Sequence, residues 1–150
     1  TGLDPSATML QRADDRGISV VRGVAEALQF ADETFETALI VTTICFVDDI
    51  ETTLREAHRI LRPGGHLIVG YIDKESPVGR TYLTNKDENP FYEDATFVST
   101  DELLTALEAI GFSAFEFAQT IFRMPGELTE PDRVEDGYGD GGFVGIKARR

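Results

Sequence analysis

The sequence predicts an α/β fold: a mostly parallel sheet with helices on both faces and an antiparallel last strand. Residues 50–62 carry apolar side chains at helical spacing, and residues 66–72 form a short, mostly apolar run after two glycines. A helix that returns into a covered strand is half of a βαβ crossover unit. Strand and helix patterns alternate along the rest of the chain, before two final strand patterns.

The N-terminal quarter predicts one helix and two strands. Ser6 is placed to cap a helix that ends near Gly17. Residues 18–21 are β-branched and predict a short strand, and the continuous apolar character of residues 37–42 predicts a central one. We expect residues 22–36 to form a loop with one helical turn.

The helix over 50–62 has clear start and stop signals. Asp49 can accept hydrogen bonds at its N-terminus, and Pro63 disfavours helical backbone at the residue before it. Gly64 and Gly65 can adopt the turn conformations that larger residues resist. The predicted order is therefore helix, glycine turn and buried strand.

The C-terminal half predicts one helix and two strands. Residues 73–98 are irregular and too long for a simple connection. Ser99 opens a capping box, and Gly111 is placed to end the helix that follows. Residues 112–122 and 143–148 predict the final strands, joined by a polar loop.

Composition limits the class of protein. A chain of 150 residues is the size of one domain, which we expect to span residues 1–150. The net charge of −13 argues against nucleic acid or an anionic membrane surface as a partner. A single cysteine fits a reducing cytoplasm, and no Cys/His spacing predicts a metal site.

Three segments of the chain match known sequence motifs. Arg55 to Gly70 match the pattern REAxRxLxPGGxLxxG closely. Residues 1–10 resemble GxDxSxxML, and Gly23 to Phe30 resemble GDAExLPF. In this order and spacing, across about half of the chain, the three motifs together resemble the class I S-adenosylmethionine-dependent methyltransferases, whose sheet is Rossmann-like.

The resemblance implies S-adenosylmethionine as the cofactor and a set of residues that bind it. Asp4, followed by Pro5, takes the position of the acid that accepts hydrogen bonds from the ribose; the alternative is a solvated or helix-capping aspartate. Val24 and Ala25 border the adenine ring, although Val24 replaces the family's usual aspartate and cannot accept from the base. Thr42 follows the central strand and would line the cleft.

The resemblance also implies an acceptor pocket. Cys45 lies between cofactor and substrate, but neither histidine is placed to activate it, so a small buried thiol is the favoured interpretation. Arg80, Tyr82, Phe91 and Tyr92 belong to the irregular segment, which either shapes this pocket or packs as a small aromatic core of its own.

The family's first strand and glycine-rich loop are absent from these 150 residues and belong upstream of Thr1. In the family's sheet this strand lies between the strand that ends at Asp4 and the strand over 37–42. We expect the gap to be closed by direct pairing of those strands, by a strand from another copy in a homodimer or strand exchange, or by a separate N-terminal piece.

The favoured function is methyl transfer from S-adenosylmethionine to a small-molecule acceptor. Because the sulfonium is already activated, the protein contributes mainly positioning and exclusion of water. The alternative is a non-catalytic methyltransferase-like module used for binding or dimerisation. A dinucleotide-dependent reductase is disfavoured, since the C-terminal glycines follow no strand and open no helix.

Overall fold

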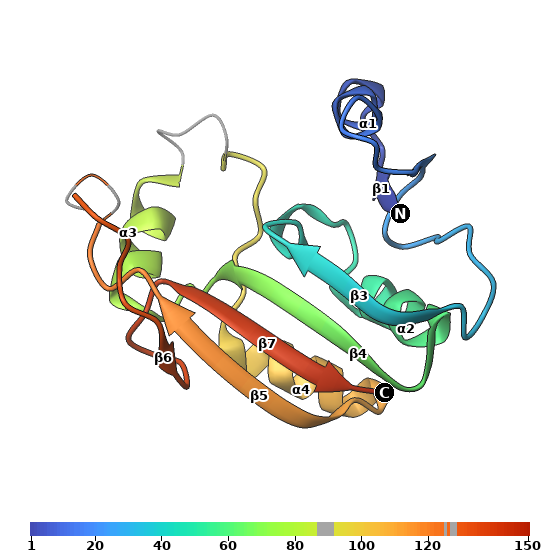
Figure 1. Cartoon of the computed structure of the whole chain (residues 1–150). Helices are drawn as coiled ribbons and strands as arrows, with labels where there is room; N and C mark the ends of the chain where they lie inside the picture. The colour runs from blue at the N-terminus through green and yellow to red at the C-terminus, as the bar shows by residue number, and fades with distance from the viewer. Residues whose placement is uncertain (87–91, 125, 127–128) are drawn as a thin grey trace.

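The computed structural model describes residues 1–86, 92–124, 126 and 129–150. Its strands form two separate sheets (Figure 1). In the small sheet, β1 (Gly2–Asp4) and β2 (Val20–Arg22) pair in parallel. The large sheet has the strand order β3-β4-β7-β5-β6. Its strands are β3 (Phe35–Val41), β4 (Leu61–Ile72), β5 (Ser113–Thr120), β6 (Glu135–Asp136) and β7 (Phe143–Arg149).

The large sheet is mixed, which corrects the prediction of a mostly parallel sheet. Only β3 and β4 pair in parallel, whereas β7 runs antiparallel to both of its neighbours, β4 and β5. The antiparallel last strand is therefore confirmed. The small sheet is separate from the large one: β1 and β2 pair with each other and, in the described part of the chain, neither pairs with β3.

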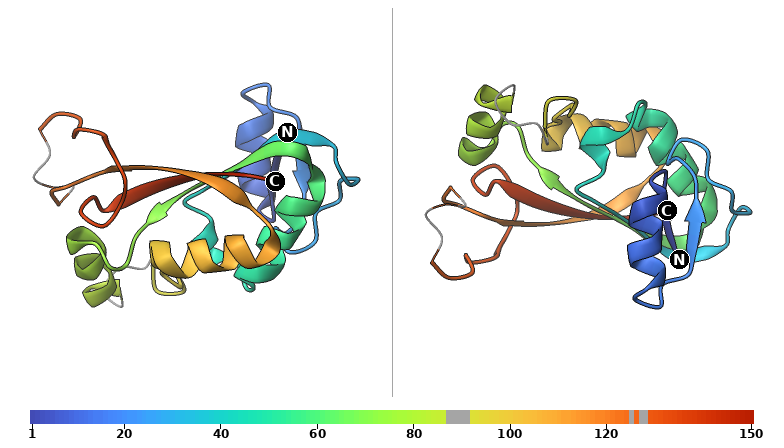
Figure 2. Two further views of the ribbon diagram at one scale, coloured as in Figure 1. Left: turned by 90° about the horizontal axis from the view of Figure 1, so that it is seen from below. Right: turned by 90° about the horizontal axis from the view of Figure 1, so that it is seen from above.

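The helices are distributed unevenly over the two sides of the sheet. They are α1 (Ala7–Asp14), the 3-10 turn η1 (Ile44–Phe46), α2 (Ile50–Ile60), α3 (Pro77–Thr84) and α4 (Thr100–Ile110). Figure 2 shows α2, α3 and α4 on one side of the large sheet and α1 on the other, beside the small sheet. Helices thus lie on both sides, but α1 packs on β1 and β2 and leaves much of the large sheet's second face open.

The hydrophobic core lies between the large sheet and the two helices α2 and α4. Alternate residues of β4 and β7 point into it, as expected for strands with one covered face. Its fully buried members include Leu54, Leu67, Tyr71, Leu103, Leu107 and Ile146. Each such side chain contributes about 1.5–3 kcal/mol relative to an exposed one, so this layer dominates the stability of the fold.

The predicted helix ends are confirmed where their signals are local. Ser6, Asp49 and Ser99 each accept a hydrogen bond from the first turn of their helix, and Ser99 forms the complete capping box. Gly111 ends α4 in the left-handed conformation, with φ of 111°. The helix α3 was not predicted, because the segment from residue 73 was interpreted as irregular. Its signal was a Ser-Pro pair at the cap and first position.

The turn between α2 and β4 is tighter than predicted. The helix ends at Ile60, and Leu61 is already extended, fully buried and opposite Phe35 of β3. The register with β3 then shifts before the pairing resumes at His66. Gly64 has φ of 80°, which is the left-handed conformation that the glycine prediction required.

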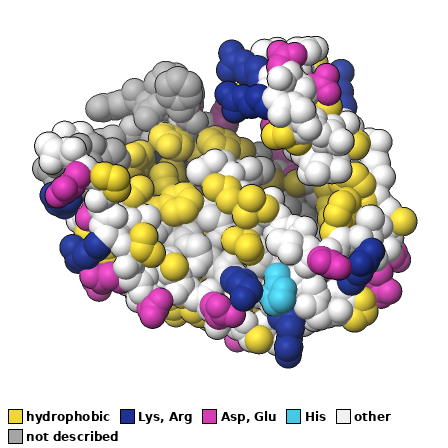
Figure 3. Space-filling view, viewed as in Figure 1, with side chains coloured by type: hydrophobic (Ala, Val, Ile, Leu, Met, Phe, Trp, Pro, Cys, Tyr) yellow, Lys and Arg dark blue, Asp and Glu magenta, His cyan; other side chains and the backbone are white. Residues whose placement is uncertain are grey.

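Figure 3 shows the open face of the large sheet. Hydrophobic side chains spread across it, and α1 stands above them as a separate prominence. Leu39 of β3 is 66% exposed, and Val41 of the same strand is also exposed. This face and the edge of β3 therefore carry apolar surface that the described residues do not cover.

Candidate functional site

A hollow of about 420 Å³ lies where β1 and β3 end, and we call it the Asp4 hollow. It is lined by Leu3, Asp4, Pro5, Val24, Ala25, Glu26, Thr42, Thr43, Phe46, Val47 and Asp48. All five residues that the sequence assigned to the cofactor are in this lining. The structure therefore brings together segments from three separate parts of the chain, at the strand ends where open α/β sheets bind ligands.

Asp4 is half-buried at the wall of this hollow. Its Oδ1 accepts a hydrogen bond of 2.7 Å from the Ser6 amide, which fixes the carboxylate at the start of α1. In the described part of the chain its Oδ2 has no hydrogen-bond donor. The aspartate thus makes a local turn and still offers one oxygen to a hydroxyl-bearing ligand.

The loop with Val24 and Ala25 is a hydrogen-bonded turn, in which Ala27 donates its N–H to the Val24 carbonyl at 3.3 Å. The segment predicted as one turn of helix is therefore a single hydrogen-bonded turn and not part of a helix. Val24 is exposed and turns an apolar surface to the hollow. The resemblance placed Glu26 with Val24 and Ala25 beside the adenine ring, but its Oε1 accepts from the Asp48 amide at 2.8 Å. This bond joins the loop to the residues that open α2.

Arg59 of α2 fastens the same loop from its other end. Its guanidinium donates to the Leu28 and Phe30 carbonyls at 2.9 and 2.8 Å and to Asp32 at 2.7 Å. It also makes a two-pronged pair with Glu56, through Nε at 2.7 Å and Nη2 at 2.8 Å. These bonds raise the pKa of Arg59 and lower the pKa of Glu56. Both residues stand in the quoted REAxR motif, but the motif alone did not reveal this role.

Thr42, directly after β3, has a φ of 51°. A β-branched residue rarely adopts this left-handed conformation, which costs about 1–3 kcal/mol. Its N–H donates to the Gly70 carbonyl of β4 at 2.8 Å, and its hydroxyl donates to the Val41 carbonyl at 2.8 Å. The backbone is therefore held in a strained turn at the point where the strand meets the hollow.

A second hollow of about 350 Å³ adjoins the first, and we call it the Tyr92 hollow. It is lined by Thr42, Cys45, Phe46, Tyr71, Ile72 and Tyr92. Thr42 and Phe46 line both hollows, so the two share a wall. Two molecules bound in these hollows would lie side by side across one strand end.

A buried hydrogen-bond chain holds the end of β4 at the Tyr92 hollow. The Tyr71 hydroxyl donates to Thr100 Oγ1 at 2.6 Å, and Thr100 Oγ1 donates to Asp73 Oδ2 at 2.7 Å. Asp73 is only 2% exposed and also accepts from the Glu75 amide at 2.9 Å. Burial raises the pKa of Tyr71, so this phenol stays protonated and serves as a donor. The chain ties β4 to the first turn of α4.

The predicted acceptor residues are placed differently from one another. Cys45 and Tyr92 line the Tyr92 hollow, and Tyr82 packs edge-on against Tyr92 with 5.5 Å between ring centroids. Burial raises the pKa of Cys45, which agrees with an unreactive thiol. Arg80 is exposed on α3 beside Glu75 and does not line the hollow. Phe91 lies outside the described residues.

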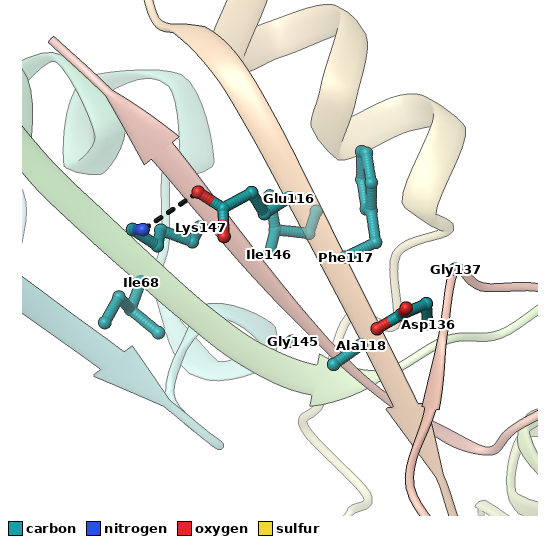
Figure 4. Close-up of a pocket in the computed structure, with 9 residues that line it drawn as sticks. All are labelled: Ile68, Glu116, Phe117, Ala118, Asp136, Gly137, Gly145, Ile146 and Lys147. Carbon is teal, nitrogen blue, oxygen red and sulfur yellow. Dashed lines mark hydrogen bonds and ion pairs between the residues drawn. The ribbon is translucent and has the colours of Figure 1, made fainter.

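A larger hollow of about 640 Å³ lies over the middle of the large sheet (Figure 4). Three charged residues of the described chain line it: Lys147 and Glu116, on neighbouring strands, pair with each other at 2.9 Å, and Asp136 is the third. Figure 4 shows Phe117 turned toward the helix side, away from this pair. Among the described residues, it shares no lining residue with the Asp4 hollow or the Tyr92 hollow.

Two further properties concern the described residues as a whole. They contain no group of three or more His, Cys, Asp or Glu side chains placed to hold a metal ion. None of their helices has the length and apolar character needed to cross a membrane.

Comparisons with known proteins agree with the class that the fold and the strand-end hollows define. Residues 1–69 match a family described as a methyltransferase domain. A crystal structure from Thermotoga maritima, described as a SAM-dependent methyltransferase and possible histamine N-methyltransferase, is 49% identical with a TM-score of 0.96. The match covers 99% of this chain and 72% of that one.

Two uncharacterised proteins are also similar along almost the whole chain. One from Methanocaldococcus jannaschii is 40% identical over 99% of this chain and 72% of its own length. One from Mycobacterium tuberculosis is 35% identical over 98% of this chain and 53% of its own length. The chain belongs to the class I S-adenosylmethionine-dependent methyltransferase family, whose cofactor is S-adenosylmethionine. It spans between about half and three-quarters of the length of these relatives.

Proposed function

We propose that residues 1–150 act as one methyltransferase domain that transfers a methyl group from S-adenosylmethionine to a small-molecule acceptor. The cofactor occupies the Asp4 hollow and the acceptor occupies the Tyr92 hollow. The observation that carries this assignment is their common wall at Thr42 and Phe46. The net charge of −13 favours a small molecule over a nucleic acid as the acceptor.

The residues of the Asp4 hollow fit the cofactor in their chemistry. The Oδ2 of Asp4 is available to accept from ribose hydroxyls, and Val24 and Ala25 offer an apolar surface for a flat base. Glu26 is occupied by the Asp48 amide and therefore positions the loop instead of contacting the ligand. Arg59 fastens the other end of this loop, so the apolar surface is held ready before binding.

The bound sulfonium supplies an activated methyl group for in-line displacement. The chain's contribution is geometric: the strained turn at Thr42 and the apolar ring of Phe46 form the boundary between the hollows. No side chain is needed as a nucleophile, which agrees with the raised pKa of Cys45.

A non-catalytic binding or dimerisation module is the second candidate. The observation that favours it is the unpaired outer edge of β3 in the described part of the chain, together with the exposed Leu39 on that strand. Such an edge is a site for strand addition from another chain. This candidate predicts association without binding of S-adenosylmethionine.

Substitution of Asp4 by alanine tests the proposed function. Calorimetry with S-adenosylhomocysteine on the complete gene product should show binding weakened by about 1–3 kcal/mol, because a charge-assisted hydrogen bond is lost. Asp14→Ala is the matched control, since Asp14 is an exposed acid in the last turn of α1. Unchanged affinity in Asp4→Ala would overturn the ribose assignment, and a wild-type protein that binds no S-adenosylhomocysteine would favour the non-catalytic module.

A further inference from the structure

The walls of the Tyr92 hollow are unusually rich in aromatic rings. Phe46, Tyr71 and Tyr92 make up half of its six lining residues. The Phe46 and Tyr92 rings are nearly parallel, with 11° between their planes and 6.4 Å between their centroids. Phe46 is 49% exposed, although it is large and apolar. Two rings of nearly the same orientation therefore line the hollow, and the Phe46 ring is only partly covered by protein.

The position of Tyr92 is fixed by contacts on several sides. Tyr82 meets it edge-on, with 88° between the ring planes, and the Phe97 centroid lies 5.6 Å from that of Tyr92. The segment that follows is tied to η1, because Thr96 donates its N–H to the Cys45 carbonyl at 2.7 Å. A ring supported in this way loses little freedom when a ligand stacks on it.

The described residues that line the hollow are uncharged. Among the described residues that line it there is no carboxylate, ammonium or guanidinium group. Burial raises the pKa of both Cys45 and Tyr92, so neither is charged at neutral pH. A charged acceptor would lose its hydration there without gaining an opposite charge, which is costly.

We propose that the methyl acceptor carries a flat, uncharged aromatic ring, and that Phe46 and Tyr92 select it by stacking. This inference rests on the proposed function, since the Tyr92 hollow is an acceptor site only when the Asp4 hollow holds the cofactor. Aromatic pairs prefer offset-stacked or edge-on contacts and gain energy beyond the area that they bury. A saturated ring of similar size buries similar area without that gain, so the walls discriminate between the two.

Fluorine NMR on the complete gene product, saturated with S-adenosylhomocysteine, tests the proposal with three probes. They are 5-fluoroindole as a flat neutral bicycle, a fluorinated hydrindanol as a neutral saturated bicycle of similar size, and fluorocholine as a cation without a ring. We expect 5-fluoroindole to bind about tenfold more tightly than either of the others. Equal or weaker binding of 5-fluoroindole would overturn the proposal, and tightest binding of fluorocholine would assign the aromatic walls to a cation instead.

Variants locate the binding in the Tyr92 hollow. Tyr92→Leu should weaken 5-fluoroindole about tenfold, whereas Tyr92→Phe, which keeps the ring, should retain binding. Phe115→Leu on β5 is the matched control, because its ring pairs with Phe117 away from both hollows. Unchanged affinity in a folded Tyr92→Leu would overturn the assignment. Calorimetry with S-adenosylhomocysteine, run in parallel, separates this failure from failure of the proposed function.

Discussion

Thr42 shows at the scale of one residue how the fold retains an unfavourable conformation at the candidate site. Its backbone lies in the left-handed region, and its hydroxyl donates to the Val41 carbonyl. Thr42 also lines both hollows. Strain of this kind persists only where the surroundings hold it in place. Here the amide bond to Gly70 of the adjacent strand does so.

Replacing Thr42 by glycine should therefore stabilise the chain. Glycine adopts this conformation without strain, so we expect the free energy of unfolding to rise by about 0.5–1 kcal/mol in urea titrations. Thr37→Gly is the control, since Thr37 is an exposed residue in the regular part of β3 and its replacement should lower the free energy by about 0.5–1 kcal/mol. Equal destabilisation by both changes would show that the Thr42 turn is not strained.

At the scale of a structural element, Arg59 connects α2 to the loop of residues 23–32. Arg59→Met should lower the free energy of unfolding by about 2–3 kcal/mol, because several charge-assisted hydrogen bonds to the loop are lost at once. Hydrogen exchange at residues 23–32 should accelerate, since the loop loses its attachment. Arg55→Met on the same helix is the control; its exposed pair with Glu51 should contribute less than about 0.5 kcal/mol.

The pair of Arg59 and Glu56 makes the stability of the chain depend on pH. The bond from Arg59 holds the pKa of Glu56 below its usual value. The stabilising effect of this bond is therefore complete above the unfolded pKa of about 4.3, and it is lost as the pH falls through the lower folded pKa. Urea titrations at pH 7 and pH 3.5 should therefore differ less in Arg59→Met than in wild type. An unchanged difference would show that Glu56 does not depend on Arg59.

The elements also show which parts of the fold could be predicted from the sequence. Helix caps such as Ser99 and the left-handed Gly111 were correct because their signals lie within a few residues of each other. The family resemblance assigned to the cofactor five of the eleven residues that line the Asp4 hollow: Asp4, Pro5, Val24, Ala25 and Thr42. The roles of Glu26 and Arg59 were not predicted, because their partners lie 22 or more residues away and no local pattern encodes such a bond.

At the scale of the whole molecule, the main departure from prediction is the division of the sheet. A hollow of about 500 Å³ separates the small sheet from β3, with Leu3 and Ile18 on one side and Leu39 on the other. Direct pairing of β1 with β3, one of the three expected ways to close the gap, is not what the described residues form. At the α2 side of this hollow, the buried hydroxyl of Thr53 has no hydrogen-bond partner in the described structure. Strand pairing depends on distant segments, which is why sequence periodicity could not reveal the division.

The open edge of β3 should make the 150-residue chain associate when it is expressed alone. Thr34 and Thr42 donate their N–H groups toward the β4 side, to Ile60 and Gly70, so by alternation the N–H of Leu39 points to the open edge. An unpaired strand edge with apolar side chains recruits another strand, which here would come from a second copy. Light scattering coupled to size exclusion should show species larger than a monomer, increasing with concentration.

Leu39→Pro separates strand addition from unspecific hydrophobic association. Proline is tolerated on an edge strand, so the fold should survive. It removes the outward N–H together with the exposed leucine side chain, whereas Leu39→Thr removes only the large apolar side chain, so association should decrease more in Leu39→Pro than in Leu39→Thr. Ile40→Pro is the matched control. The N–H of Ile40 faces β4, so loss of this N–H should lower the free energy of unfolding by about 3 kcal/mol. A wild-type chain that stays monomeric at all concentrations, or a folded Leu39→Pro that associates as wild type does, would contradict strand addition. If association does depend on the Leu39 amide, a strand added at this edge would occupy the hollow beside Thr53 and extend the large sheet toward β1.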